Sequence, residues 1–477
     1  DWCGKHGLKY TGHVLCEDNM SSQRKCVGAA MRFYEYQQPP GIDLLCETWD
    51  PIDTAKQCSS VAHQLDKPTR LCECYGVTGW DFPFAGHKAL GDWLAVLGIN
   101  FRCPHLAWYS MAAEAKRDDP ASISFQSSWY PYYSLVEDYF AHQAAALHLG
   151  EEIRDILVVH PIESAWGAKA QIPDAEKKAF DAPVIDLRNV LMASHLDFDY
   201  GDEDHLARFA KVTGKGTAAV LQVGVAKYRV VVLPKMLTIR GTTLKLLEDF
   251  AKAGGQVVYV EQIPGYLDAE KSAKPAKAFQ AFAKATLETL PKLVAGRGRR
   301  VSITARGKGE LPELFYMLKQ GEDFETLFVV NTSMKHEGNN PNECPRLAGR
   351  TAAYKQVAVT LKSGLDASAK VYELNQETGV WTKLDKSVKF SAGKFHITAS
   401  FAIFQSHLYV ITKQTIPGAL PETSEPKITG VCELPHCCWE YSLDNPNTIV
   451  LDQAIYEVDG ESDEQLHYIL TIDDAVR

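Results

Sequence analysis

The stretch RLCECYGVTGWDFPFAGHKALGDWLAVLGINFRCPHLAWYS, residues 70–110, contains a strand, a helix and a second strand in direct succession. Residues 70–74 form a short apolar run, and residues 84–97 then place Leu90, Trp93 and Leu94 on one face of a helix. Gly98 ends that helix, and INFRCPHLAWYS predicts the next strand. Strand and helix alternating in this way predict a βα unit of a parallel sheet.

The rest of the segment 1–150 repeats this order. Helices are predicted over residues 21–38, ended by Pro39, and over residues 51–65. Four or five βα units are too few to close a (β/α)₈ barrel. We therefore expect residues 1–150 to be the C-terminal part of a TIM-type barrel, with the barrel beginning before this segment.

Three glutamates each close an apolar run: Glu17 in YTGHVLCE, Glu47 in GIDLLCE and Glu73 in RLCE. A parallel barrel carries its functional groups where strands end, so these acids predict one acidic pocket. Two carboxyl groups in such a pocket can act as general acid and as base or nucleophile, which suits glycoside hydrolysis. An ion pair with a nearby arginine is the alternative role for any single one of them.

The later segments change pattern twice. Residues 151–310 hold the runs DILVVHP, LDFDYGDE, YRVVVLP and QVVYVEQIP with helices between them, which predicts a small doubly wound sheet. No glycine-rich nucleotide-binding motif is present, so a packing or assembly role is favoured, and residues 266–300 are predicted as a solvated helix. Short strands with period two predict a β-sandwich over residues 311–415, and a further β unit starts within residues 416–477.

The composition of the chain indicates which kinds of binding partner and which cellular compartment to expect. The chain of 477 residues is 45% hydrophobic with a net charge of −10, which argues against nucleic acid and anionic membranes. No run of eighteen apolar residues and no signal-peptide pattern is found. Four of the 12 cysteines, Cys16, Cys46, Cys72 and Cys74, lie in or at the ends of apolar runs, and Cys72-Glu-Cys74 and Cys437-Cys438 lack metal-site spacing, so we expect most cysteines to be reduced. We expect a reducing compartment, the cytoplasm, although a periplasmic or secreted location stays open.

The blocks HVLCED, residues 71–110 and SISFQSSWYPYY resemble the catalytic barrel of bacterial α-L-rhamnosidases of glycoside hydrolase family 106 and their relatives. Downstream, LDFDYGDE and the segment around YRVVVLP are similar to the flavodoxin-like domain that follows those barrels. NPNTIVLDQAIYEVDG resembles the start of a jelly-roll, sugar-binding module.

The resemblance implies an exo-acting, inverting glycosidase of plant or bacterial glycans, with Glu17 as general acid, Glu73 as general base and Glu47 in reserve. It implies a carbohydrate substrate and no cofactor. Relatives hold calcium, but no EF-hand-like loop is visible, so no metal ligand is assigned. It also implies a partial chain, which is inactive alone if the missing barrel strands are needed.

Further residues are expected to line the sugar pocket. Aromatic side chains that could stack on a pyranose are Trp80, Trp108, Tyr109 and Trp129, and side chains that could bond hydroxyl groups are His13, Asp18, Asn100, His105 and Gln126. Core packing is an equally good account of each aromatic residue, and a structural role is the better one for His105.

Two other functions stay open at this point. One is a non-catalytic carbohydrate-binding or scaffold fragment, which would keep the aromatic residues and the β modules. The other is a hydrolase of the β-galactosidase superfamily with a different sugar, such as a galactoside or a glucuronide. An acidic sugar would need a cation, for which Arg102 is the nearest candidate. The sequence does not decide the oligomeric state.

Overall fold

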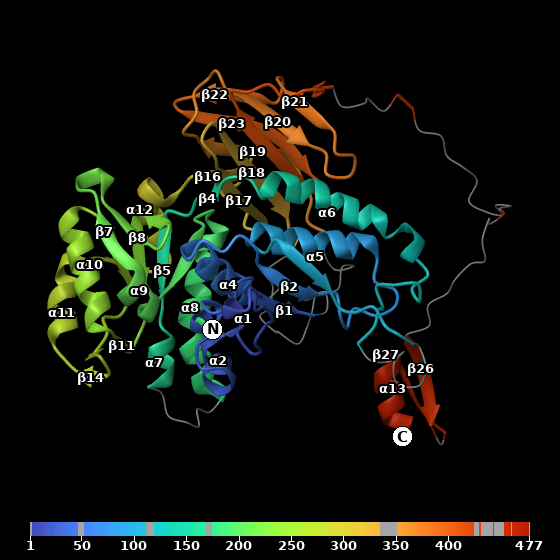
Figure 1. Ribbon diagram of the computed structural model, residues 1–477, viewed down its shortest axis with the longest axis horizontal. Coiled ribbons are helices and arrows are strands. Elements are labelled where there is room, and N and C mark those ends of the chain that lie inside the picture. Colours follow the sequence, from blue (N-terminus) through green and yellow to red (C-terminus); the bar gives the residue numbers. More distant parts are fainter. Residues whose placement is uncertain are drawn as a thin grey trace.

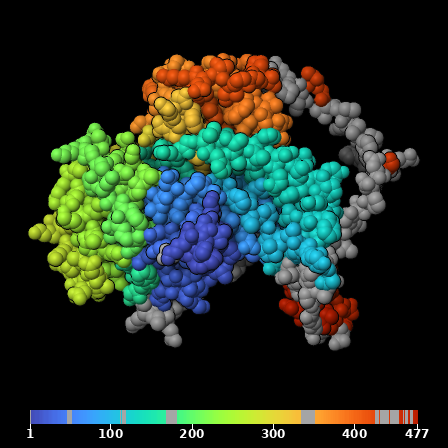
Figure 2. Space-filling model, viewed as in Figure 1, coloured from blue at the N-terminus to red at the C-terminus, as the bar shows by residue number. Residues whose placement is uncertain are grey.

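The computed structural model describes residues 2–45, 52–110, 112, 119–167, 174–333, 351–423, 429–430, 442, 453–458 and 460–476. Three units pack together in it: a βα segment up to about residue 150, an α/β unit and a β-sandwich (Figure 1). In Figure 2 the blue N-terminal segment lies in the centre of the visible face, between the green α/β unit and the teal residues of the following helices.

The βα segment has a three-stranded parallel sheet in the order β1-β2-β3, formed by Gly41–Leu44, Leu71–Cys74 and Phe101–Pro104. Helices α4 (Ile52–Gln64) and α5 (Phe84–Val96) connect these strands, and α6 (Ser134–Leu147) follows them. The predicted strand–helix–strand order of residues 70–110 is therefore present. Both α4 and α5 are almost wholly buried, because the sheet covers one side of them and the other units cover the rest.

The helix predicted over residues 21–38 is two shorter helices. They are α2 (Met20–Cys26) and α3 (Ala30–Tyr34), preceded in the chain by α1 (Trp2–Lys5). Gly28 lies between α2 and α3 with φ at +77°, a left-handed conformation that ends the first helix. Val27, Met31 and Tyr34 stand at helical spacing in the sequence, but Gly28 divides the run and leaves Val27 as the C-cap of α2.

The strand predicted over YTGHVLCE is reduced to one bridge, in which Gly12 pairs parallel with Pro40. Gly12 and Cys16 both have positive φ, so the chain leaves the extended conformation before Glu17. Glu17 consequently lies in a loop past the sheet rather than at the end of a strand.

The α/β unit has a five-stranded, all-parallel sheet in the order β15-β12-β10-β5-β6. Numbered along the chain, these strands run 2-1-3-4-5 from one edge, the order of flavodoxin-like doubly wound sheets. The strands are β5 (Ile156–His160), β6 (Phe198–Asp202), β10 (Val230–Leu233), β12 (Gln256–Val260) and β15 (Ala283–Ala285). The helices are α7 (Ile162–Trp166), α8 (Asp174–Ala193), α9 (Glu203–Phe209), α10 (Gly241–Ala253), α11 (Lys274–Ala278) and α12 (Leu290–Gly298).

Residues 266–300, predicted as one solvated helix, are instead several short elements. The segment contains β13 (Tyr266–Leu267), β14 (Glu270–Lys271) and the edge strand β15 in addition to α11 and α12. Pro275 and Pro291 stand in the first turns of α11 and α12. A proline is tolerated there and not inside a helix, which is why the Ala- and Lys-rich composition does not yield a single helix.

The β-sandwich has a four-stranded sheet, β16-β19-β23-β22, facing a seven-stranded sheet, β25-β21-β20-β24-β18-β17-β4. The first is built from Val301–Ala305, Tyr354–Lys362, Lys394–Phe401 and Val388–Ser391 in that order. The second is built from Leu420–Pro421, Trp381–Leu384, Lys370–Leu374, Ser406–Thr412, Phe324–Asn331, Leu314–Gln320 and Glu151–Glu152. Strands β4 and β16 thus join the sandwich although residues 151–310 were expected to belong to the α/β unit.

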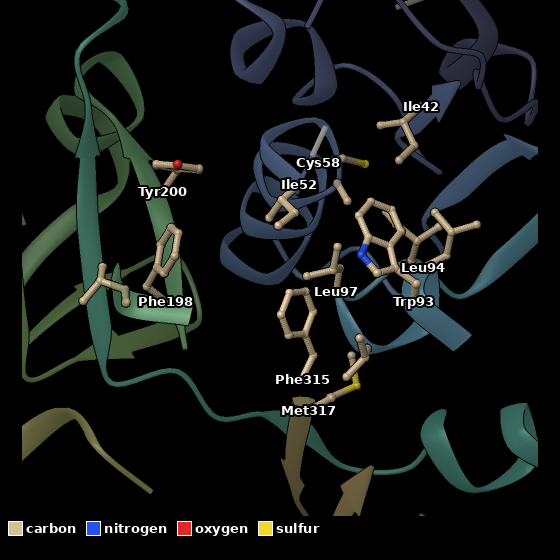
Figure 3. Close-up of a cluster of buried hydrophobic side chains, with 14 of the residues drawn as sticks. Ile42, Ile52, Cys58, Trp93, Leu94, Leu97, Phe198, Tyr200, Phe315 and Met317 are labelled. Carbon is tan, nitrogen blue, oxygen red and sulfur yellow. The ribbon is translucent and has the colours of Figure 1, made fainter. Parts of the chain in front are cut away.

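One hydrophobic core runs through all three units. Ile42, Trp93 and Leu94 of the βα segment, Phe198 and Tyr200 of β6, and Phe315 and Met317 of β17 belong to a single cluster of buried residues (Figure 3). Separate cores fill the outer side of the α/β sheet and the inside of the sandwich. The βα segment therefore packs against both the α/β unit and the β-sandwich.

A network of buried ions crosses the same junction. Arg154 donates to Asp197 at 3.1 Å and to Asp199 at 2.6 Å, and Lys56 of α4 reaches Asp197 at 2.7 Å. Arg154 also pairs with Glu152, to which Arg70 donates as well. Each charge has an opposite partner at hydrogen-bond distance, which is the condition under which buried ions are tolerated.

The last described residues form a hairpin, β26 (Gln453–Val458) and β27 (Glu461–Tyr468), followed by helix α13 (Ile469–Val476). Among the helices that the structure describes, none combines the length and the apolar character needed to cross a membrane.

Candidate active site

Two carboxyl groups lie side by side on one face of the three-stranded sheet. Asp43 of β1, Glu73 of β2 and Cys103 of β3 are partners in register. Their chain neighbours in β1 and β2, among them Ile42 and Cys72, are buried on the opposite face. Side chains alternate across a strand, so this face of the sheet is polar while the other faces the core. Strands of a parallel barrel are usually buried on both faces, and the alternation here departs from that pattern.

His13 joins these two carboxyl groups. Its Nε2 lies 2.9 Å from Glu73 Oε2 and 3.6 Å from Asp43 Oδ2, and its Nδ1 lies 3.1 Å from the Val14 carbonyl oxygen. The Val14 carbonyl oxygen can only accept, so Nδ1 donates to it, and Nε2 donates to Glu73 when the ring is protonated. Burial opposes this charge, but the Val14 carbonyl and the carboxylates of Asp43 and Glu73 outweigh it and raise the pKa of His13.

His105 approaches Glu73 from the loop after β3. Its Nε2 lies 3.8 Å from Glu73 Oε1. Gly76 makes this approach possible: a Cβ atom there would lie 2.8 Å from both the His105 ring and the Leu45 side chain. Glycine directly after β2 therefore leaves the space that the imidazole occupies.

Glu17 lies nearby but is nearly inaccessible, with 4% of its surface exposed. Its backbone carbonyl accepts hydrogen bonds from the side chains of Gln23 at 3.0 Å and Gln57 at 2.9 Å, which fix the loop. Among the described residues, none donates a hydrogen bond to its Oε1. Burial raises the pKa of Glu17 to about 7, so near neutral pH a large part of this carboxyl group is protonated.

Asp18 accepts a hydrogen bond of 2.6 Å from the Asn19 side chain, and burial raises its pKa. Burial likewise raises the pKa of Asp43. Glu47, the third predicted acid, falls outside the described residues.

Aromatic residues follow the same strand ends. Trp80, after β2, and Trp108, after β3, pack edge to face with ring centroids 5.2 Å apart. Gln126 donates to the Trp108 carbonyl at 2.6 Å, and Tyr109 is fully exposed. Trp80, Trp108, Tyr109 and Gln126 thus share the loops beyond the carboxyl ends of the strands.

Two of the predicted pocket residues lie elsewhere. Asn100 precedes β3 and bonds the backbone at Arg70 and Pro68, at the amino ends of the strands and away from Glu73. Trp129 packs against Phe84 and Tyr133 in a small apolar cluster beside α6. The structure therefore brings His13 and His105 together with Glu73, and it leaves Asn100 and Trp129 in structural positions.

Asp43 was not anticipated from the sequence. Glu17, Glu47 and Glu73 were predicted because each ends an apolar run, whereas Asp43 stands inside GIDL. A charged residue within a short buried strand was the available signal, since such a residue needs a partner. Aligning GIDL with LCEC by strand register would have placed Asp43 beside Glu73.

The donor set of this cluster resembles a metal site in composition. Ligand atoms of His13, Asp43 and Glu73 lie within 4.8 Å of one another. An imidazole with two carboxylates suits a transition-metal ion better than Ca²⁺, which takes oxygen ligands. However, both ring nitrogens of His13 are already hydrogen-bonded, so a cation would first have to displace one of these bonds.

Comparison with known proteins links this architecture to glycosidases. The chain matches no protein-family model. It is 24% identical over 269 residues to a curated protein of Formosa agariphila named "Putative beta-glucuronidase". That match covers 54% of this chain and 20% of the relative.

Two solved structures share the fold. A rhamnosidase from Novosphingobium sp. PP1Y superposes with a TM-score of 0.65 and 14% identity over 89% of this chain and 39% of that one. A GH42 beta-galactosidase from G. stearothermophilus gives 0.54 and 9% identity over 85% of this chain and 64% of that one. This chain therefore spans less than half of the rhamnosidase, and the names of all three similar proteins are those of glycosidases.

Proposed function

We propose that the chain contributes to a glycoside hydrolase whose reaction centre is the cluster of His13, Asp43 and Glu73. The observation that carries the proposal is the position of Asp43 and Glu73 in register on adjacent parallel strands, joined by the His13 imidazole, which lies 2.9 Å from Glu73. Function in parallel βα folds concentrates at the carboxyl ends of strands. The likeness of the fold to glycosidases supports the same class of reaction.

Glu73 is assigned as the general base. A carboxylate can take a proton from a water molecule as that water attacks the anomeric carbon. His13 orients Glu73, since its Nε2 is hydrogen-bonded to Glu73 Oε2 at 2.9 Å. Asp43, on the other side of the imidazole, holds His13 in place.

Glu17 is assigned as the general acid, with Glu47 in reserve. A carboxyl group with a pKa of about 7 keeps its proton at neutral pH and can give it to the glycosidic oxygen as the bond to the anomeric carbon breaks. The substrate would have to reach this buried group through the loop that carries it. An inverting outcome, which the resemblance implies, needs about 6.5–9.5 Å between the two carboxyl groups.

The proposed substrate is a glycan with a terminal sugar, α-L-rhamnose first, cleaved from the end of the chain. Trp80, Trp108 and Tyr109 offer stacking surfaces for a pyranose ring beyond the strand ends. A glucuronide is less well supported, because Arg102 already pairs with Glu137 at 2.9 Å and stacks on Phe140. We propose that no metal takes part, on the ground that His13 is fully hydrogen-bonded.

Release of nitrophenol from a panel of nitrophenyl glycosides tests the proposal. The panel should contain α-L-rhamnoside, β-D-galactoside, α-L-fucoside and β-D-glucuronide, offered to this chain and to the full-length product of the gene. Turnover that is abolished by Glu73→Gln would support the assignment and identify the sugar. Sugar binding without turnover of any glycoside in the panel, by folded full-length protein, would favour the non-catalytic alternative.

A further inference from the structure

A hollow lies on the outer face of the seven-stranded sheet, beside α6. Its volume is about 520 Å³, within the range of about 300–1,000 Å³ that small-molecule sites occupy. It is built from different elements than the cluster of His13, Asp43 and Glu73. We propose that this hollow is a second binding site, for an uncharged saccharide of one or two sugar units.

The floor of the hollow follows from strand register. Leu374 of β20 lies opposite Trp381 of β21, and Thr326 of β18 lies opposite Val410 of β24. Directly opposite residues of an antiparallel pair point to the same face, so these side chains form one continuous surface. Trp381 and Val410 stay partly exposed on it. The surface offers an aromatic and aliphatic platform of the kind that the C–H face of a pyranose covers.

One wall is helix α6, whose small side chains leave space for the hollow. Ala145 and Ala146 line the hollow, where larger side chains would fill it. His142 of the same helix is fixed by a hydrogen bond of 2.9 Å from Nδ1 to the Gln376 carbonyl. In the neutral ring this bond leaves Nε2 as an acceptor for a ligand hydroxyl.

The opposite wall is the loop after β24, which supplies polar groups. Thr412 Oγ1 accepts from the Gln414 backbone at 3.1 Å, and Thr415 Oγ1 accepts from Lys370 at 2.7 Å. A hydroxyl whose oxygen accepts from the protein can still donate its hydrogen to a ligand. Gln414 also donates to Asp323.

The charges around the hollow define the class of ligand. Among the described residues that line it, no lysine or arginine occurs, and Asp323 is the one acid. Lys370, beside the hollow, is engaged with Thr415 Oγ1 at 2.7 Å, so an anionic sugar has no counter-ion among the lining residues. A neutral sugar has an apolar face for Trp381 and hydroxyls for the threonines. The residues that line the hollow therefore fit a neutral saccharide. Binding of that saccharide in the hollow does not require that the chain hydrolyses it.

Saturation-transfer NMR on the full chain tests the proposal. The probes are methyl α-L-rhamnopyranoside and methyl β-D-galactopyranoside, with D-glucuronate as the charged counterpart. Ala145 is exposed, so Ala145→Trp fills the hollow without disturbing the core, and Ala141→Trp makes the same change on the exposed side of α6 outside it. Trp381→Ala removes the platform itself.

We expect transfer to at least one neutral glycoside in the unmodified chain, in Ala141→Trp and in Glu73→Gln. Ala145→Trp and Trp381→Ala should weaken its binding about tenfold or more. Binding that is equally strong in the unmodified chain, in Ala145→Trp and in Trp381→Ala would place all saccharide binding outside the hollow and overturn the proposal. Transfer to D-glucuronate alone, or to none of the probes, would overturn it too. Glu73→Gln is expected to retain saccharide binding in the hollow. The NMR experiment therefore tests this second site even if the chain proves to have no hydrolase activity.

Discussion

His13 Nε2 and Glu73 Oε2 are hydrogen-bonded at 2.9 Å, although 60 residues separate them in the chain. The bond fixes the position of both side chains, and the neighbouring carboxylates of Asp43 and Glu73 raise the pKa of His13 against the effect of burial. A catalytic base needs such a partner to stay ionised and oriented, so the pair is the point at which the proposed reaction is easiest to disturb.

Glu73→Gln should lower turnover of the preferred nitrophenyl glycoside by about 10²–10⁴-fold, because the amide cannot accept the proton of the attacking water. Its shape is conserved, so sugar binding should persist. The measurement is steady-state kinetics of the full-length protein, with Glu322→Gln on the exposed surface as control. Equal turnover in the two variants would remove Glu73 from the mechanism.

Glu17 gives a pH dependence with a defined sign. Its pKa is about 7 in the folded chain against 4.5 ordinarily, so the folded state holds this proton more tightly. The free energy of unfolding therefore decreases as pH rises from about 4.5 to about 7. Glu17→Gln, which cannot ionise, should be more stable than the parent at pH 8 by about 1–3 kcal/mol.

Urea denaturation of parent and Glu17→Gln at pH 5 and pH 8 measures this effect. If Glu17 is also the general acid, turnover of the parent should decrease above pH 7, as the proton is lost, and should be strongly reduced in the variant at every pH. A variant that is stabilised at pH 8 and fully active would assign Glu17 a structural role only.

His195 should be a structural counterpart of His13. It is buried where the α/β unit meets the sandwich, with Nδ1 2.7 Å from Glu310 Oε2 and Nε2 2.8 Å from the Leu314 carbonyl. His195→Ala leaves the Glu310 carboxylate without this partner and should cost about 3–5 kcal/mol in unfolding free energy. His148→Ala, at an exposed histidine, is the matched control and should change it little.

The same contact predicts acid sensitivity. His195, Ser302 and the Ile303 backbone outweigh burial and lower the pKa of Glu310. A lowered carboxyl pKa contributes stability above the ordinary value near 4.5, and that stability is lost as pH falls through the folded pKa. Parent and His195→Ala should therefore converge in stability toward low pH. A constant difference between them would contradict the ion pair.

Removal of metal ions should leave the protein unchanged. Both ring nitrogens of His13 are hydrogen-bonded, so a cation at this cluster would first have to displace one of these bonds. Dialysis against EDTA, followed by melting temperature and turnover with and without added Ca²⁺ or Zn²⁺, is the measurement. A melting temperature that rises with either ion in the parent but not in Asp43→Asn would reveal a metal site.

The elements with strong periodicity could be predicted from sequence. Helices α4 and α5 end within about one residue of their predicted bounds, because apolar spacing and the flanking proline and glycine define them. The YTGHVLCE strand was expected and is nearly absent, since two positive φ angles that apolar character does not reveal bend the chain there. Local composition predicts where the chain favours a strand, not whether a neighbour pairs with it.

The site was harder to predict than the fold. Glu73 and His13 were both predicted as site residues, but the sequence did not indicate that they are in contact. The contact depends on how the His13 segment, 60 residues before Glu73, and the Asp43 strand, 30 residues before it, align beside β2. Asn100 illustrates the converse. It stands next to a strand in sequence, yet at the amino end, where it bonds the Arg70 backbone instead of a substrate.

The buried ions around Arg154 have a consequence for how this chain can be divided. A piece ending near residue 150 would carry Lys56 and Arg70 away from Asp197 and Glu152. Those cations would be left without counter-ions, and the apolar surface around Trp93 and Phe198 would be exposed to water. Cutting the chain at this boundary would therefore lower the free energy of unfolding of both pieces. The βα segment and the α/β unit that follows it are expected to unfold together, as one cooperative block.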